Sequence, residues 1–88
     1  SLTLDDNQII LKKGNNSYIK IEDNKVEVKN NDCFIIIDNG NINIKGNSIK
    51  IDGNDITLNA SNILLKASGS NIDMSSSVNI KGSSITLN

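Results

Sequence analysis

The sequence predicts an all-β fold of short stacked strands, and three observations support this prediction. Two aliphatic residues separated by one residue, usually a polar one, recur twelve times along the chain. Seven of the eleven steps between these doublets are seven residues long. The chain also contains 16 Asn and 11 Ser but very few Ala, a composition that disfavours helices. Because the repeat covers nearly the whole chain, it determines the architecture before any single motif does.

The doublets have the spacing of strands rather than of a coiled coil. A coiled-coil seam needs apolar residues three and then four positions apart, whereas these lie two and then five apart. Two residues of helix turn through about 200°, but on a strand the same two side chains point to one side. In chain order the doublets are Leu2/Leu4, Ile9/Leu11, Ile19/Ile21, Val26/Val28, Ile35/Ile37, Ile42/Ile44, Ile49/Ile51, Ile56/Leu58, Ile63/Leu65, Ile72/Met74, Val78/Ile80 and Ile85/Leu87.

The segments between doublets have the chemistry of tight corners. Most are about four residues long, and the second residue is often Gly, Ala or Asn, as at Gly46, Gly53 and Ala60. Gly and Asn tolerate positive φ, and small residues suit a sharp bend. Such corners are too short for crossover helices. A hairpin meander is possible in principle, but the constant phase of the doublets favours a solenoid of parallel rungs. Three longer corners, 12–18, 29–34 and 66–71, should bulge from it.

Size and charge indicate one small domain that spans residues 1–88. The chain has a formal charge of −1, one Cys, and no His, Pro, Trp or Arg. The lone Cys33 cannot form an intramolecular disulfide. Nothing resembles a signal peptide, and the longest apolar run, 33–37, is far below the roughly 18 residues of a membrane span. A start at Ser1 without an initiator Met predicts a C-terminal fragment of a longer protein.

Geometry favours three intertwined chains over one. Wound alone with three strands per coil, twelve strands give four coils, about 19 Å tall at ~4.8 Å per rung, with an open edge at each end. In a triple-stranded intertwined β-helix, which is a trimeric β-prism, the twelve strands of each chain give about twelve layers and a height of roughly 57 Å. We therefore expect a homotrimer with Gly/Asn corners. The expected trimer core comprises Ile35, Ile37, Ile42, Ile44, Ile49, Ile51, Ile56, Leu58, Ile63, Leu65, Val78 and Ile80.

The segments 56–60 and 78–87 resemble the C-terminal repeats of cell-puncturing spike proteins, namely the central spikes of contractile phage tails and VgrG proteins of type VI secretion systems. The resemblance extends over essentially the whole chain. It implies a stiff trimeric needle beneath the tail tube, which breaches the target cell envelope when the sheath contracts. It also implies a location in a virion tail baseplate or a secreted injection apparatus, extracellular when deployed.

The chain departs from one branch of that family at its C-terminal end. Some spikes coordinate iron at a pointed apex through a His-x-His pair, and this chain has no His. It ends in a full repeat instead, which predicts a blunt tip at Ile85, Leu87 and Asn88. Spikes of the blunt kind are capped by a PAAR-repeat tip protein, so the resemblance implies such a partner. The alternative is that the chain frays or was truncated there.

No pattern in the sequence predicts catalysis, a cofactor or a metal. The fragment 52–55 is the nearest to a calcium loop, but it lacks the bidentate Glu that would follow. Glycosidase chemistry needs two carboxylates across a cleft, and a filled prism has none. Nucleic-acid binding is not expected, because nine Lys are offset by ten acids and Tyr18 and Phe34 are the only aromatics.

The sequence therefore predicts a structural, non-enzymatic needle. Two other functions stay open at this point. One is the trimeric shaft of a receptor-binding tail fibre or adhesin, in which the repeat only spaces a head from a base. The other is a single-chain β-solenoid that polymerises end to end into a filament.

Overall fold

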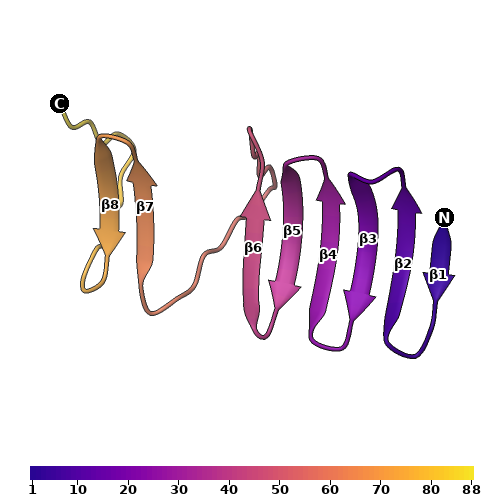
Figure 1. Cartoon of the computed structure of the whole chain (residues 1–88). Coiled ribbons are helices and arrows are strands. Elements are labelled where there is room, and N and C mark those ends of the chain that lie inside the picture. The colour runs from indigo at the N-terminus through magenta and orange to yellow at the C-terminus, as the bar shows by residue number, and fades with distance from the viewer. The chain divides into compact units, whose positions relative to one another are not determined.

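The computed structural model describes residues 1–88 and contains strands and turns but no helix (Figure 1). The predicted all-β fold is confirmed. The eight strands are β1 (Leu2–Leu4), β2 (Gln8–Lys13), β3 (Ser17–Glu22), β4 (Lys25–Asn30), β5 (Cys33–Asp38), β6 (Asn41–Lys45), β7 (Ile63–Ala67) and β8 (Ser70–Met74).

The chain divides into two compact units, Ser1–Ile51 and Asp52–Asn88. The first unit holds a six-stranded sheet in the order β1-β2-β3-β4-β5-β6, and the second holds the two-stranded sheet β7-β8. Strand order follows chain order within each sheet, so every connection within a sheet is a hairpin between neighbours. The first unit is therefore a simple meander.

Every strand pair is antiparallel, so the predicted parallel rungs are wrong. The turns explain the difference. Asn39 and Gly40 form a two-residue turn between β5 and β6, with φ of 49° and 87°. Positive φ at both central residues is the signature of a type I′ turn, whose twist suits an antiparallel hairpin. Asn31, with φ of 53°, occupies the equivalent two-residue turn between β4 and β5.

The longer corners are hairpin ends rather than bulges. Within 12–18 the strands β2 and β3 run almost to the turn, which is only residues 14–16 and contains Gly14 at φ 67°. Within 29–34 the turn shrinks to residues 31–32, and within 66–71 to residues 68–69. The extra residues therefore lengthen the strands and do not loop out from the sheet.

The register places the doublets of the meander directly opposite one another. One row crosses the sheet as Leu2, Leu11, Ile19, Val28, Ile35 and Ile44, and the other as Leu4, Ile9, Ile21, Val26, Ile37 and Ile42. Because alternate side chains of a strand share a face, both rows lie on the same side of the sheet. We call these twelve residues the doublet face.

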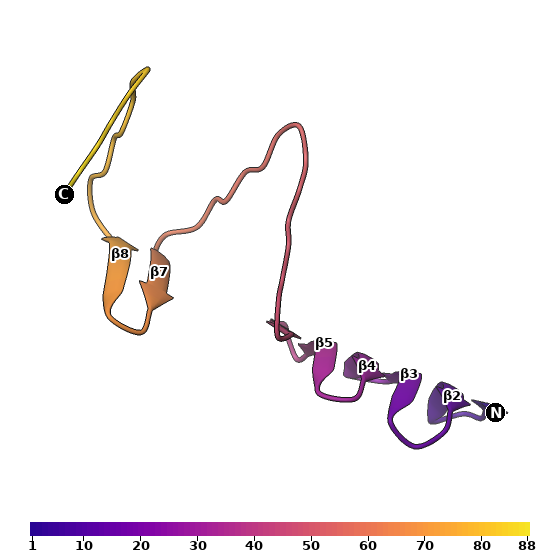
Figure 2. The same cartoon turned by 90° about the horizontal axis from the view of Figure 1, so that it is seen from above.

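Within the first unit, the doublet face has no second layer over it. Figure 2 looks along the strands and shows β2 to β5 as a single layer. No hydrophobic side chain of the chain is buried. Eleven of the twelve doublet-face residues are at least 40% exposed, so the meander by itself leaves this face open.

Residues 46–62 and 75–88 belong to neither sheet. They nevertheless carry the same repeat, with doublets at Ile49/Ile51, Ile56/Leu58, Val78/Ile80 and Ile85/Leu87. Between them, β7 and β8 form a hairpin in which Leu65 lies opposite Ile72 and Ile63 opposite Met74. One repeat therefore has two structural outcomes: paired strands in some places and chain outside any strand in others.

Candidate functional site

The doublet face is the largest chemical feature of the molecule. Its exposed residues range from 40% accessible at Ile21 to 66% at Leu4. The side chains are aliphatic and mostly β-branched, which suits a pleated surface with close cross-strand neighbours. Soluble monomers rarely expose a contiguous apolar patch of this kind, and such patches mark interaction surfaces. The doublet face is therefore the candidate functional site.

The opposite face is polar and held together by a hydrogen-bonded ion pair. Glu27 of β4 is only 8% exposed. Its Oε2 accepts a hydrogen bond from the Tyr18 hydroxyl at 2.8 Å, and its Oε1 lies 2.9 Å from Lys25 Nζ. A second pair on this face joins Lys20 Nζ to Glu22 Oε1 at 3.6 Å. The two faces of the sheet therefore differ in chemistry: this one carries ion-paired charges, whereas the doublet face is aliphatic.

These contacts shift three pKa values. Hydrogen bonds from Lys25 and Tyr18 lower the pKa of Glu27 below its ordinary value of 4.5. The hydrogen bond to Glu27 in turn raises the pKa of Tyr18, and the same carboxylate raises the pKa of Lys25. All three groups therefore keep their usual charge state at neutral pH, with Glu27 and Lys25 ionised and Tyr18 protonated.

The structure places the predicted core residues in three environments. Ile35, Ile37, Ile42 and Ile44 lie together on the doublet face, and Ile63 and Leu65 lie on β7. The remaining six lie in the two segments outside the sheets: Ile49, Ile51, Ile56, Leu58, Val78 and Ile80. A single chain brings only the first group into one continuous surface.

The predicted tip residues lie at the end of the second segment. Ile85 is 51% exposed and Leu87 is 90% exposed, and neither they nor Asn88 belong to a strand. These side chains have no apolar cover within the chain. A capping partner at this position stays a prediction.

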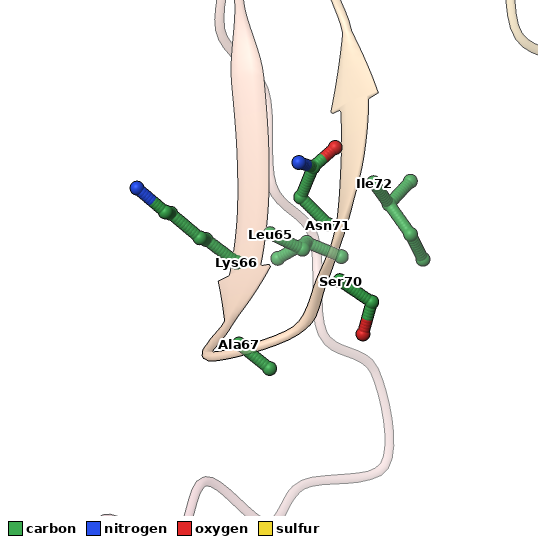
Figure 3. Close-up of a pocket in the computed structure, with 6 residues that line it drawn as sticks. All are labelled: Leu65, Lys66, Ala67, Ser70, Asn71 and Ile72. Carbon is green, nitrogen blue, oxygen red and sulfur yellow. The ribbon is translucent and has the colours of Figure 1, made fainter.

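Two of the surface hollows are open and have no acidic residue in their lining. The one in Figure 3 measures about 300 Å³ and lies on the hairpin β7–β8. The polar ends of Lys66, Ser70 and Asn71 point in different directions there, and no acid lines it. A hollow of about 390 Å³ lies beside Leu11, Tyr18 and Val28. Neither has the paired acid and base, or the nucleophile with its base, that bond cleavage requires.

Three further observations concern metal ligands, membrane-spanning helices and the free thiol. No three His, Cys, Asp or Glu side chains lie close enough together to hold a metal ion. The structure has no helix of the length and hydropathy needed to cross a membrane. Cys33 is a free, exposed thiol.

Comparison of the chain with protein-family models, with curated proteins and with solved structures finds no match.

Sequence reasoning missed two features that the structure reveals. The dipeptide Asn39-Gly40 between alternating apolar residues is a strong hairpin signal, and it could have predicted the meander. The buried carboxylate of Glu27 had no signal in the sequence, because its partner Tyr18 comes from the neighbouring strand nine residues away. Only the register of β3 against β4 brings the two together.

Proposed function

We propose that this chain is one third of a homotrimeric structural needle, without catalytic activity, at the tip of a contractile injection machine. The observation that carries the proposal is the doublet face, which lies uncovered on one side of a single-layer sheet. A sheet with one apolar face needs a second layer to be stable in water. Nothing within the first unit supplies that layer, and in this proposal other copies of the chain supply it.

The exposure of the doublet face supports an obligate assembly. Eleven of its twelve aliphatic side chains are at least 40% exposed. Obligate interfaces are the more hydrophobic ones and resemble a domain core cut in two. Three doublet faces around one axis would form a filled apolar interior and leave the three polar faces in water. A closed threefold arrangement also leaves no doublet face exposed.

The two parts of the chain would enter this trimer differently. In the meander each strand already has neighbours from its own chain, so each copy would contribute a complete sheet as one side of a prism. Residues 46–62 and 75–88 repeat the doublets without forming strands within the chain. Extended backbone in a protein core needs hydrogen-bond partners, which the other two chains would provide. Intertwining is thus proposed for these segments and not for β1 to β6.

A needle function follows from this architecture together with the resemblance of segments 56–60 and 78–87 to cell-puncturing spikes. A filled prism with short corners resists bending, and interchain strand pairing along the C-terminal segments prevents one chain from leaving alone. The needle would contact the target cell envelope transiently during deployment, from a virion baseplate or a secreted apparatus. A PAAR-repeat protein would cover the apolar end at Ile85 and Leu87.

Light scattering coupled to size exclusion tests the assembly. We expect a mass of about 28.5 kDa, three times the 9.5 kDa of one chain. Because intertwined chains separate slowly, the trimer should also survive unheated SDS. A monomer at micromolar concentration, or complete dissociation in unheated SDS, would contradict the proposal.

One observation favours a second candidate, an end-to-end filament. β1 and β6 are free edges of the six-stranded sheet, and free edges can pair with other chains. Electron microscopy separates the two functions. Discrete particles of uniform length support the needle, whereas ordered filaments of indefinite length support edge-to-edge polymerisation.

A further inference from the structure

The polar face of the meander carries a line of lysines and aromatic rings. The register aligns Lys12, Tyr18, Lys29, Phe34 and Lys45 directly opposite one another on the five successive strands β2 to β6. We call these five residues the lysine row. At about 4.8 Å per strand the row is about 19 Å long, with a lysine on every second strand, about 10 Å apart. Both aromatic residues of the protein belong to it.

The lysines of the row are not neutralised by the sheet. The two ion pairs of the polar face involve Lys20 and Lys25, and neither includes a lysine of the row. Two of the row's ammonium groups are instead held over rings. Lys29 Nζ lies 6.0 Å from the centroid of Tyr18, and Lys45 Nζ lies 5.9 Å from the centroid of Phe34. A ring attracts a cation without cancelling its charge. The row is therefore a preformed line of positive charge.

The shape of the charge selects the kind of partner. The neighbouring row on the same face contains Lys20 and Glu27, and beyond it lie Glu22, Lys25 and Asp38. Lys20 is paired with Glu22, and Lys25 with Glu27. On this face, positive charge without a carboxylate partner is thus confined to the lysine row, a strip one residue wide. A planar anionic membrane would also be brought against the carboxylates, whereas a linear polyanion can follow the strip alone. Charge complementarity therefore favours a linear partner.

The rings argue against a nucleic acid as that partner. Single strands bind proteins largely by stacking their bases on open aromatic faces. Here an ammonium group lies over each ring, so the rings serve to position the lysines and not as stacking platforms. What remains is recognition of regularly spaced negative charges. We propose that the lysine row binds an acidic polysaccharide through its carboxylate, sulfate or phosphate groups.

This inference goes beyond the needle function and does not depend on the trimer. The row lies on the face opposite the doublet face, so it is accessible in one chain and would stay on the outside of a trimer. Three copies around an axis would present three such strips. Measuring the oligomeric state in the same samples separates failure of this inference from failure of the proposed assembly.

The test is a binding titration with fluorescein-labelled polygalacturonate, followed by fluorescence anisotropy at low salt, with neutral dextran as the blank. The triple variant Lys12→Gln/Lys29→Gln/Lys45→Gln should bind on the order of a hundredfold more weakly, about fivefold per lysine. For this variant, the slope of log affinity against log salt concentration should decrease in magnitude by about 2. The matched control is Lys13→Gln/Lys66→Gln/Lys81→Gln, which removes the same charge outside the row and should bind like the wild type.

Two further variants keep the test decisive if the triple variant folds poorly. Lys12→Gln alone removes a lysine that makes no ring contact, and it should weaken binding about fivefold. Replacing all three row lysines with Arg keeps the charge and should preserve binding. Equal weakening of the row variant and its matched control would overturn the proposal, because only net charge would then matter. Tighter binding to a thymidine 20-mer or to phosphatidylglycerol vesicles than to polygalacturonate would also overturn it.

Discussion

The sharpest test of the doublet face compares the same substitution at two consecutive residues of β5. Ile35 lies on the doublet face between Val28 and Ile44, whereas Ile36 lies on the polar face between Glu27 and Asn43. Ile35→Lys should abolish the trimer, and Ile36→Lys should leave it intact. Local strand propensity and net charge change identically in the two variants, so any difference between them reports on the two faces.

The expected magnitude follows from the exposure of Ile35. It is 45% exposed in the single chain, and full burial of an isoleucine contributes about 2 kcal/mol. Covering the exposed part therefore contributes about 1 kcal/mol per chain, or about 3 kcal/mol per trimer. Three unpaired ammonium groups buried in its place cost several kcal/mol each. The total, on the order of 10 kcal/mol, corresponds to about seven orders of magnitude in the assembly constant.

Light scattering after size exclusion measures this outcome directly, and circular dichroism reports whether each variant keeps its strands. Monomers or aggregates from Ile35→Lys, together with trimers from Ile36→Lys, would agree with the reasoning. Trimers of equal melting temperature from both variants would refute it, because the doublet face would then not be an interface. Loss of assembly in both would refute it as well, since the polar face beside Glu27 should accept a lysine.

Three other predictions concern single positions. Ile49→Asp should prevent trimer formation, because the carboxylate would be buried without a partner. If light scattering still finds a trimer and calorimetry an unchanged melting temperature, this doublet does not face the core. Lys25 is the main cause of the lowered pKa of Glu27, so the ionised carboxylate stabilises the fold above about pH 4.5, and this contribution is lost as the pH falls further. The melting temperature of Glu27→Gln should therefore depend less on pH between about pH 3 and 7 than that of the wild type. Gly40→Ala should lower the free energy of unfolding in chemical denaturation by about 1 kcal/mol, because φ is 87° at Gly40. Gly69→Ala, where φ is not positive, should have little effect, and equal effects of the two substitutions would mean that backbone strain is not the cause.

The doublet pattern predicted the faces of the strands correctly, although it failed for their direction. In the register of the meander every doublet residue lies opposite another, as at Ile19 and Val28 or Ile37 and Ile42. This follows from a period of two, which puts both members of a doublet on one side of any strand. The same period holds for parallel and antiparallel strands alike. Phase alone therefore could not distinguish a solenoid from a meander.

The direction of neighbouring strands depended on the backbone conformation of a few turn residues. Asn39-Gly40 adopts positive φ at both positions and reverses the chain within two residues. In contrast, residues 46–62 contain comparable corners at Gly46 and Gly53, neither of which has positive φ, and they form no hairpin. The corners are similar in composition, because each contains Gly beside Asn, but the order and number of their residues differ. Their difference in backbone conformation therefore does not follow from composition alone.

The candidate binding surfaces differ in how far the sequence could predict them. The doublet face follows from the repeat, since aliphatic side chains at a fixed period require burial. The lysine row does not, because its five members come from five strands, and consecutive members are 5 to 11 positions apart in the chain. Charge counting treated the nine Lys and ten acids as one mixed surface. Register divides them into a line of lysines and a separate set of ion pairs.

By itself, then, the sequence determined an all-β chain with one apolar side and a need for cover, because side-chain alternation and hydrophobicity are local properties of a strand. Only the tertiary structure decided that the strands of the first unit pair with their own neighbours, that Glu27 is enclosed by Tyr18 and Lys25, and that three lysines align across the sheet. These are contacts between residues on different strands. They depend on turn geometry and register, which set the distances that composition and period leave open.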